Sequence, residues 1–506
     1  VPTGTTKYEK RGIAVKVPAW DVTKCVQCNL CSLVCSHAAI RPYLVDEGTA
    51  PASFVTKKAL GKQFAGKAFR IQVSPLDCTG CGNCVDVCLG KCLTMEPLSE
   101  QKAEEANWEY AQTIPEVDST ILNKANVKES QFLKPLFEFS GACAGCGETP
   151  YAKLITQLYG EKTYWVNGVG CSLAWAGAFP SLPYTKNKEG RGPAFYGTLF
   201  EDQAENGLGV VLATKQRRAY VKQVAQQLLP LVPGTELEGA IHAWLSSFDD
   251  LDANDADARK LTAALESASL TGEAAELAEK LLKNKDQLGK KVVWLFGGDG
   301  WAYDIGYGGL DHVMASGEDI NVFVVDTEVY SNTGGQASKA SNIGQVAQFA
   351  AAGKEVKKKS LAEIAMQYGY VYVAQVAMGA NPAQTIKAIA EAEAYHGPSL
   401  IIGYSPCEMH SIKGGMMNCQ KEMKRAVDCG YWNLFRFNPA APAGQRFSMD
   451  SKAPAGGYQE FLMNEARYSR LTREFPDRAG ELFQRNEKAA MDRYQHLLKL
   501  KAMYSE

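Results

Sequence analysis

Eight cysteines in two matching runs constrain this 506-residue chain more than any other feature of its sequence. The runs share intervals of two, two and three residues between cysteines, and the second begins 53 positions after the first. Their members are Cys25, Cys28, Cys31 and Cys35, and then Cys78, Cys81, Cys84 and Cys88. Zinc sites use pairs of cysteines rather than runs of four, and disulfide frameworks are typical of small secreted domains. The repeat therefore indicates two sites for a larger inorganic group.

The spacing is that of bacterial two-cluster ferredoxins, in which the fourth cysteine of each run ligates the other cluster. We expect one [4Fe–4S] cluster, cluster A, to be held by Cys25, Cys28, Cys31 and Cys88. The second, cluster B, would be held by Cys78, Cys81, Cys84 and Cys35. The proline that commonly follows the fourth cysteine is replaced by Ser36 and Leu89, which are not ligand positions.

The whole composition narrows the class of protein. The 54 basic and 56 acidic residues give a formal net charge of −2, which argues against nucleic-acid binding. No apolar stretch is as long as a membrane span, and the N-terminal residues lack the pattern of a signal peptide. Fifteen cysteines, most of them in ligand spacing, predict a reducing, cytoplasmic location. The chain lacks an initiator Met, so we expect a processed product or part of a longer protein.

The pattern along the chain predicts a multidomain protein that combines α/β and α+β parts. We expect a ferredoxin-like domain over 1–97, a linker over 98–140, an α/β domain over 141–430 and a C-terminal helical tail over 431–506. In the α/β domain, apolar runs alternate with helical patterns, which is typical of a parallel sheet with ligands at the carboxyl ends of its strands. The expected strands lie within 291–300, 320–330, 371–376 and 398–407, and a helical insertion covers about 201–290.

Two of these strands end in a pair of loops that resembles the thiamine diphosphate motif. Gly298-Asp299-Gly300 ends the first, and an Asn-containing loop from Asp326 to Gly335 follows the second. Mg²⁺ takes oxygen ligands and usually shares them with phosphate, and glycines let backbone N–H groups approach that phosphate. We expect Mg²⁺ to be held by the Asp299 carboxylate, the Thr327 hydroxyl and the Val329 carbonyl. Further cofactor-binding positions expected in these loops are Gly298, Gly300, Asn332, Thr333 and Gly334.

Four more cysteines are scattered over the α/β part: Cys143, Cys146, Cys171 and Cys407. Cys143 and Cys146 form a CxxC flanked by glycines, which by spacing alone could be redox-active, bind zinc or be inert. Spacing alone does not select Cys171 and Cys407 as their partners.

Together these features resemble one family, the pyruvate:ferredoxin (flavodoxin) oxidoreductases, and in particular the C-terminal half of its long members. The matching segments are CVQCNLCSLVCSHAAIRP, GACAGCGETPY, GVGCSLAWAG, GRGPAFYGTLFEDQAENGLG and DTEVYSNTGGQASKA. The resemblance implies a third [4Fe–4S] cluster on Cys143, Cys146, Cys171 and Cys407, next to the cofactor. It also implies that Asn332 is the catalytic residue facing the thiazolium and the substrate, and that Glu148, Gly170 and Ser172 line the cofactor pocket. Cys92, Cys419 and Cys429 match no ligand position and are expected to be buried thiols.

The implied reaction is the oxidation of pyruvate with coenzyme A to acetyl-CoA and CO₂, with two electrons passed through three clusters to ferredoxin or flavodoxin. The family's N-terminal half, which carries the substrate-binding residues, is not among these 506 residues. We therefore expect this chain to be inert or crippled alone, to need that half, and to work in a homodimer of the complete enzyme.

Two other functions stay open from the sequence. The first is another 2-oxoacid:ferredoxin oxidoreductase, acting on 2-oxoglutarate or an aryl pyruvate. The second is a non-catalytic iron–sulfur electron-transfer subunit, which would not need the Mg–diphosphate motif. The basic residues between the cysteine runs form either a solvated loop or a docking site for an acidic carrier; they are Lys57, Lys58, Lys62, Lys67 and Arg70. His37 and His410 lie near cysteines and are expected in core or surface roles.

Overall fold

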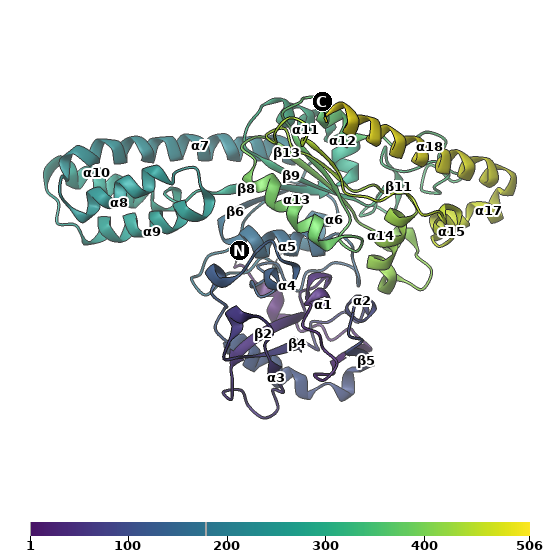
Figure 1. Cartoon of the computed structure of the whole chain (residues 1–506), viewed down its shortest axis with the longest axis horizontal. Coiled ribbons are helices and arrows are strands. Elements are labelled where there is room, and N and C mark those ends of the chain that lie inside the picture. Colours follow the sequence, from purple (N-terminus) through teal and green to yellow (C-terminus); the bar gives the residue numbers. More distant parts are fainter. Residues whose placement is uncertain (1, 178–179, 506) are drawn as a thin grey trace.

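A computed structural model describes residues 2–177 and 180–505. A small N-terminal unit with the two cysteine runs lies beneath a larger α/β unit, and helices extend from the larger unit to both sides (Figure 1). Helix α5 (Thr149–Tyr159) lies where the two units meet. Nearly all of its side chains are buried, which is unusual for a helix and follows from its having a neighbour on both faces.

The N-terminal unit has the duplicated arrangement that the two cysteine runs predict. Strands β1 (Lys16–Trp20) and β5 (Leu93–Pro97), one from each end of the repeat, pair antiparallel. The third cysteine of each run lies in a short helix that begins one residue before it: α1 (Leu30–Leu33) and α2 (Asn83–Asp86). The segment between the runs forms a three-stranded antiparallel sheet of β2 (Ile40–Asp46), β4 (Lys67–Val73) and β3 (Lys57–Lys58).

The segment expected as a linker packs against the ferredoxin-like unit. Its helices are α3 (Ala103–Thr113) and α4 (Val127–Ser130). Ala111 of α3 is buried with Val45, Phe54 and Ala68 in a small apolar cluster. Asn126 caps α4 by accepting from the backbone N–H groups of the next turn.

The larger unit is built on an eight-stranded mixed sheet with the order β15-β14-β12-β13-β9-β8-β6-β7. Six of the strands are parallel: β6 (Thr163–Asn167), β7 (Ala194–Gly197), β8 (Val292–Gly298), β9 (Asn321–Asp326), β12 (Tyr372–Val376) and β13 (Ser399–Tyr404). The antiparallel β14 (Phe435–Phe437) and β15 (Phe447–Met449) extend one edge. Strands β8 and β9 are buried along nearly their whole length, as expected for parallel strands covered on both faces. The predicted multidomain α/β and α+β fold is confirmed.

Helices cover both faces of this sheet. They are α6 (Cys171–Ala176), α11 (Tyr307–Ala315), α12 (Leu361–Met366), α13 (Pro382–Ala394) and α14 (Cys419–Asp428). A π-helical turn, Gly300–Ile305, follows the Gly298-Asp299-Gly300 sequence, and a two-stranded hairpin of β10 (Val329–Tyr330) and β11 (Gln336–Ala337) frames the Asn-containing loop.

The helical insertion projects from one side of the sheet (Figure 1). It comprises α7 (Gln203–Leu228), α8 (Glu236–Ser246), α9 (Leu251–Ser267) and α10 (Gly272–Lys283). The first part of α7 packs on the main core through Ala204 and Val211, whereas Val221 and Leu228 belong to a separate apolar core shared with the other three helices. Thr235 and Asp250 cap α8 and α9, each accepting a backbone N–H bond in the first turn.

The C-terminal segment extends to the other side of the sheet and ends in the long helix α18 (Pro476–Met503) (Figure 1). Before it lie three short helices, α15 (Tyr458–Met463), α16 (Ala466–Ser469) and α17 (Leu471–Glu474). Among the helices that the structure describes, none combines the length and apolar character needed to cross a membrane.

Candidate cofactor and cluster sites

The loops of the two cysteine runs share one backbone conformation, although their sequences differ. The second residue after the first cysteine has φ of 57° at Gln27 and 72° at Gly80. The residue after the second cysteine has φ of 60° at Asn29 and 83° at Gly82. These left-handed values favour glycine, and Asn adopts them more readily than most side chains. The first run therefore forms the same loop without glycine, and both runs turn their cysteines inward.

The structure brings the fourth cysteine of each run to the other run. Burial raises the pKa of the Cys28 thiol, and Cys88 and Cys25 are the nearby thiols that raise it further. In the same way, burial raises the pKa of Cys84 well above its usual value, with Cys81, Cys78 and Cys35 adding to the rise. The structure thus places Cys88 near the first run and Cys35 near the second, and the assignment of these thiols to clusters A and B stays a prediction.

Backbone N–H groups point at these sulfur atoms in corresponding places. Gln27 N donates to Cys25 Sγ and Gly80 N to Cys78 Sγ, both over 3.4 Å. Ala39 N donates to Cys35 Sγ over 3.3 Å and Cys92 N to Cys88 Sγ over 3.2 Å. Such bonds favour the thiolate and raise cluster potentials. In residues 2–177 and 180–505, no three His, Cys, Asp or Glu side chains converge on a single-ion site. Thiolates that share four irons stand further apart than ligands of one ion.

Asp299, Thr327 and Val329 meet where β8 and β9 end. The hydroxyl of Thr327 donates to Asp299 Oδ1 over 2.8 Å and lies 3.0 Å from the carbonyl oxygen of Val329. The carboxyl ends of the neighbouring parallel strands β8 and β9 lie at the same edge of the sheet, which brings together Asp299 and Thr327, 28 positions apart in the sequence. Three oxygen atoms of the types that Mg²⁺ prefers therefore converge at one point.

The Asp299 carboxylate lies in an environment that disfavours a bare negative charge. Burial and the neighbouring Asp326 raise the pKa of Asp299 to about 8. A divalent cation would reverse this effect, because it is the largest charge in such a site. The donor set and this charge imbalance both fit a bound Mg²⁺.

The other predicted cofactor positions surround this point, but they differ in exposure. Gly300 adjoins the Tyr330 ring so closely that a Cβ would lie 2.5 Å from it, so only glycine fits there. Ser172 is buried at the start of α6, after Gly170 with φ of 137°. Asn332, Thr333 and Gly334 occupy an exposed turn between β10 and β11. Gly298 has open space within 4 Å of its would-be Cβ.

The third group of cysteines comes together from three distant segments. Cys143 and Cys146 precede α5, Cys171 begins α6, and Cys407 follows β13. The segments are joined by a hydrogen bond from Gly147 N to the carbonyl of Pro406 over 3.1 Å. Burial raises the pKa of Cys171, and the neighbouring Glu148, Cys146 and Cys143 raise it further. A hydrogen bond with Ser331 acts in the opposite direction.

Glu148 lies at the centre of this cysteine group rather than at a free surface. Its side chain accepts a hydrogen bond from Trp175 Nε1 over 3.0 Å, and burial raises the pKa of Glu148 to about 7. The group also reaches the cofactor loop, because Cys171 Sγ lies 3.5 Å from the hydroxyl of Ser331. The third cysteine group and the predicted Mg²⁺ site are therefore neighbours.

Behind the Mg²⁺ site lies a buried network of charged side chains around Glu328. This residue, between Thr327 and Val329, has a left-handed φ of 63°. Its carboxylate is 2.7 Å from Arg467 Nη1 and 3.0 Å from Lys358 Nζ, and it accepts from Tyr431 OH over 2.6 Å. Although burial alone would raise it, Lys358 and Arg467 hold the pKa of Glu328 down at about 2. The network fixes a backbone conformation that the side chain alone would not choose.

Arg467 shows that the C-terminal segment does more than pack against the sheet. It belongs to α16 and is fully inside, where its Nε is 2.6 Å from Glu465 Oε2. His410 also contacts this loop, because its Nε2 lies 2.8 Å from the carbonyl oxygen of Thr327. Within the expected C-terminal tail, Arg467 thus supports Glu328, the residue between two predicted Mg²⁺ ligands.

Several contacts at these sites had no signal in the sequence. Ser338 donates to Asp299 Oδ2 over 2.6 Å, Lys358 bonds Asp326 over 2.7 Å, and Cys419 lies buried near Cys146, Cys81 and Cys407. Ser338 lies within the matching segment 326–340, but nothing in that segment pairs it with Asp299, and Lys358 and Cys419 lie outside the matching segments.

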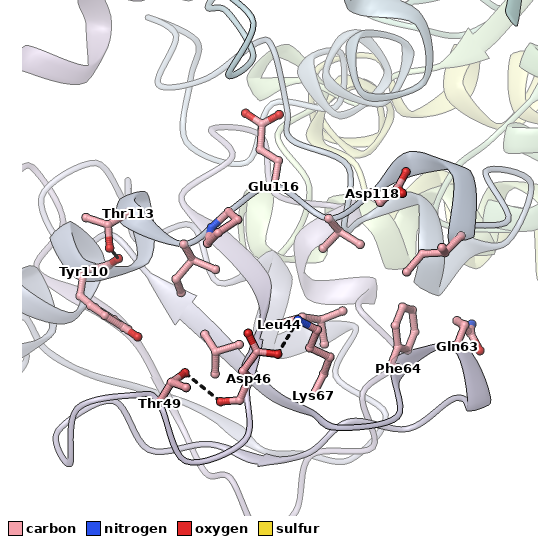
Figure 2. A pocket seen from close by; sticks show the side chains of 15 residues that line it. Leu44, Asp46, Thr49, Gln63, Phe64, Lys67, Tyr110, Thr113, Glu116 and Asp118 are labelled. Atoms are coloured by element: carbon pink, nitrogen blue, oxygen red, sulfur yellow. Dashed lines mark hydrogen bonds and ion pairs between the residues drawn. The ribbon is translucent and has the colours of Figure 1, made fainter. Parts of the chain in front are cut away.

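A cavity of about 310 Å³ on the ferredoxin-like unit is a different kind of feature (Figure 2). Its polar lining includes an exposed ion pair of Lys67 and Asp46 at 2.7 Å, and Glu116 and Asp118 lie across from it. It contains none of the twelve cysteines predicted as ligands and lies away from Asp299.

Comparison with known proteins matches two parts of the chain to protein families. The family described as "4Fe-4S dicluster domain" matches residues 24–92, and "Thiamine pyrophosphate enzyme, C-terminal TPP binding domain" matches residues 272–402. The fold and the two matches define the class: a 4Fe-4S dicluster domain joined to a thiamine pyrophosphate-binding domain.

Within this class the chain is homologous, over nearly its whole length, to the pyruvate:ferredoxin and pyruvate-flavodoxin oxidoreductases. It is 53% identical to the pyruvate:ferredoxin oxidoreductase of Moorella thermoacetica over 98% of this chain and 43% of that protein. It is 48% identical to the pyruvate-flavodoxin oxidoreductase of Klebsiella pneumoniae over 97% of this chain and 42% of that protein. The chain thus spans about two fifths of the length of these relatives.

Two further matches are more distant or more partial. The mitochondrial pyruvate dehydrogenase [NADP(+)] of Euglena gracilis is 44% identical over 98% of this chain and 28% of that protein. A solved 2-oxoglutarate:ferredoxin oxidoreductase from Magnetococcus marinus is 18% identical, with a TM-score of 0.31 over 53% of this chain and 64% of that one.

Proposed function

We propose that this chain is the cofactor-anchoring and electron-exporting part of a pyruvate:ferredoxin or pyruvate:flavodoxin oxidoreductase. The reaction would convert pyruvate and coenzyme A to acetyl-CoA and CO₂, releasing two electrons and one proton. The observation that carries the proposal is the contact between Ser331 in the cofactor loop and Cys171 in the third cysteine group. It joins a thiamine pyrophosphate-binding domain directly to a set of predicted iron ligands.

Thiamine diphosphate, when bound, would supply the carbanion chemistry that decarboxylates a 2-oxoacid. The residues of this chain would anchor it: Asp299, Thr327 and Val329 through Mg²⁺, with Gly298, Gly300 and Gly334 leaving room for its phosphates. Asn332, in its exposed turn, would face the reacting atoms. The Gly170–Ser172 segment and Glu148 would close the pocket on the side of the third cluster.

The three cysteine groups would form an electron path in the order third cluster, cluster B, cluster A. Three contacts support this order. His37, two residues after Cys35, bonds the carbonyl of Ala142 over 3.0 Å, next to Cys143. The backbone of Gly145 donates to Cys81 and opposes the burial that raises the pKa of Cys81 to about 11. Cys419 is near both Cys146 and Cys81. Cluster B would therefore receive electrons first.

Cluster A would be the exit to the carrier. Exposed apolar side chains, Val26, Leu60 and Leu89, surround its cysteine loops. Lys58 and Lys62 are exposed nearby, since Gln27 bonds both the carbonyl of Lys58 and the N–H of Leu60. Of the five basic residues expected at this place, Arg70 is instead buried against Glu104 and Lys67 pairs with Asp46. The remaining charge suits an acidic ferredoxin or flavodoxin.

The missing partner of the cofactor site would be the part that the relatives carry and this chain does not. Exposed apolar residues lie beside the predicted site: Leu199 and Phe200, Ile305, and Phe349, which is 94% exposed. The Phe200 segment and Ile305 are adjacent, because the would-be Cβ of Gly306 lies 2.9 Å from the carbonyl of Glu201. Gln348, next to Phe349, bonds Gly335 over 3.0 Å. We expect the N-terminal part of the enzyme to cover these side chains. A homodimer of the complete enzyme and a cytoplasmic location stay predictions.

Anaerobic absorbance spectroscopy tests the proposal. The chain is mixed with thiamine diphosphate and Mg²⁺, then with pyruvate and coenzyme A, with and without the N-terminal part of the enzyme. We expect the iron–sulfur band to bleach only when both parts are present. Bleaching by the chain alone would show that the N-terminal part is dispensable. Bleaching by 2-oxoglutarate or an aryl pyruvate, but not by pyruvate, would reassign the substrate. No thiamine diphosphate binding in the complete enzyme would favour an electron carrier without catalysis.

A further inference from the structure

Lys153 is a buried lysine at the junction of the two units. It lies in the middle of α5, with 1% of its surface exposed, and its side chain points into the ferredoxin-like unit. Its Nζ donates to the carbonyl of Leu33 over 2.9 Å and also to that of Ser32. These are the last residues of α1, directly after Cys31. The ammonium group therefore lies at the carboxyl end of α1, which precedes Cys35.

Among the described residues, several other buried cations have carboxylate partners, whereas buried Arg218, like Lys153, bonds uncharged oxygen atoms. Arg41 Nη2 is 2.5 Å from Glu138, Lys358 Nζ is 2.7 Å from Asp326, and Lys162 Nζ is 2.7 Å from Asp252. Within residues 2–177 and 180–505, no carboxylate oxygen lies within 4.0 Å of Lys153 Nζ. A buried ammonium without a counter-charge is costly, so groups of this kind are normally paired.

The negative groups that do face Lys153 are cysteines predicted to bind iron. Burial lowers the pKa of Lys153 to about 8, whereas Cys35 most of all, and then Cys31, favour its charged form. Arg41, the nearest cation, opposes it. Cys35 belongs to the ligand set of cluster B and Cys31 to that of cluster A, so Lys153 stands beside both.

We propose that the iron–sulfur clusters are the counter-charge of Lys153, and that its ammonium group raises their reduction potentials, that of cluster B most. A [4Fe–4S]²⁺ cluster with four thiolates carries a charge of −2 and becomes −3 when it accepts one electron. A fixed positive charge nearby favours the reduced form, and it does so more strongly in the interior, where screening is weak. The inference rests on the match to a 4Fe-4S dicluster domain and deepens the proposed electron path.

The position of Lys153 on α5 relates its charge to electron transfer between the third cluster and cluster B. The helix begins directly after Glu148, which lies among the cysteines of the third group, and Lys153 is just over one turn further along. Lys153 would make cluster B a better acceptor for electrons that leave the third cluster. It would also join the two units through its hydrogen bonds to α1.

The test uses the complete enzyme with two variants, Lys153→Gln and Lys153→Met. Both remove the charge, but Gln keeps a donor for the carbonyls of Ser32 and Leu33. Lys162→Met is the matched control, since Lys162 is also a buried lysine but pairs with Asp252. Iron content is measured first, and the potentials then follow from redox titration monitored by electron paramagnetic resonance. We expect both Lys153 variants to shift one cluster clearly, and a second less, to lower potential, with no shift in the control.

Two results would overturn the proposal. One is that both variants keep full iron and wild-type potentials. The other is that Met loses iron while Gln keeps full iron at wild-type potentials, which would make Lys153 a structural residue only. Iron content and spectra of the wild-type protein separate these results from failure of the proposed function, because they report the clusters without pyruvate turnover.

Discussion

Ser338 is the residue whose loss should report most simply on the Mg²⁺ site. Its hydroxyl donates to the Asp299 oxygen that Thr327 does not use. Groups that orient a metal ligand typically contribute 10- to 100-fold to metal affinity. We predict that Ser338→Ala in the complete enzyme weakens Mg²⁺-dependent thiamine diphosphate binding at least ~10-fold. Calorimetry measures this.

Ser316→Ala is the control for that prediction, because the Ser316 hydroxyl bonds nearby backbone groups, donating to the carbonyl of Val313 and accepting from the N–H of Glu318. If Ser338→Ala bound the cofactor as tightly as this control, Asp299 would not be the ligand that Ser338 orients.

Gly147 offers a test of the third cluster. A Cβ at this position would lie 2.4 Å from the carbonyl oxygen of Pro406 and 3.0 Å from its nitrogen, both backbone atoms that cannot move aside cheaply. We predict that Gly147→Ala displaces Cys407 and that the protein loses one cluster's share of iron while clusters A and B remain. Iron analysis with electron paramagnetic resonance measures the loss. Gly141→Ala is the control, since nothing lies within 4 Å of its Cβ. Full iron in both variants would contradict the ligand assignment of Cys407.

At the residue scale, the residues in motifs could be predicted from the sequence, but the residues that contact and orient them could not. The spacing of the cysteine runs named both groups of thiols that the structure brings together, and the two loops named Asp299, Thr327 and Val329. Ser338 lies in the matching segment 326–340, but nothing there pairs it with Asp299, and Lys153 and Cys419 lie outside the matching segments. Hydrogen bonds between distant segments leave no period in a sequence. The sequence also did not predict that Gln27 and Gly80 occupy equivalent positions in the two loops, because such different residues rarely share a left-handed backbone conformation.

At the scale of elements, α16 is the part whose role most depends on the folded structure. Arg467 bridges Glu328 and Glu465 inside the protein. Removing one partner from a buried ion pair typically costs roughly 3–5 kcal/mol, because a charge is left unpaired. We predict that Arg467→Met lowers stability by about this amount and weakens thiamine diphosphate binding, because Glu328 loses its hold on the loop. Thermal unfolding and calorimetry measure the two effects.

Arg470→Met serves as the control, since Arg470 pairs with Glu474 at the surface and such pairs contribute little. Arg467→Lys should recover part of the loss, because it restores charge but not the several bonds of the guanidinium group. An Arg467→Met protein with unchanged cofactor affinity would restrict α16 to a packing role.

The elements themselves were predictable where their patterns are long. The four expected strands correspond to β8, β9, β12 and β13, because buried parallel strands appear as continuous apolar runs. The edge strands β14 and β15 were not predicted, since they have only three residues each. The π-helical turn at Gly300–Ile305 also has no distinctive sequence signal.

At the scale of the whole molecule, the account places the electron exit at one end of the ferredoxin-like unit. We predict that the double change Lys58→Glu and Lys62→Glu slows reduction of an acidic ferredoxin or flavodoxin about 10-fold at low salt, because charge steers association. The difference should disappear at high salt, and reduction of a small uncharged dye by pyruvate should be unchanged. Stopped-flow kinetics measure the rates.

Lys283→Glu, on the helical insertion, is the control for a change of charge alone. An equal slowing in this control, or none in the double variant, would place the carrier elsewhere. The order of the units and the helical insertion were predictable from composition and periodicity. The way in which the two units pack together could not be predicted, because the contacts of α5 with α1 come from only a few buried side chains.

The central claim is that this chain carries three clusters in line with a thiamine diphosphate site. Spin quantification of the complete enzyme by electron paramagnetic resonance, after anaerobic reduction with pyruvate and coenzyme A, tests it most directly. The account predicts signals from three interacting [4Fe–4S]¹⁺ clusters, with one lost in the Cys171→Ala variant. Signals from only two clusters in the iron-replete protein, unchanged in that variant, would contradict it.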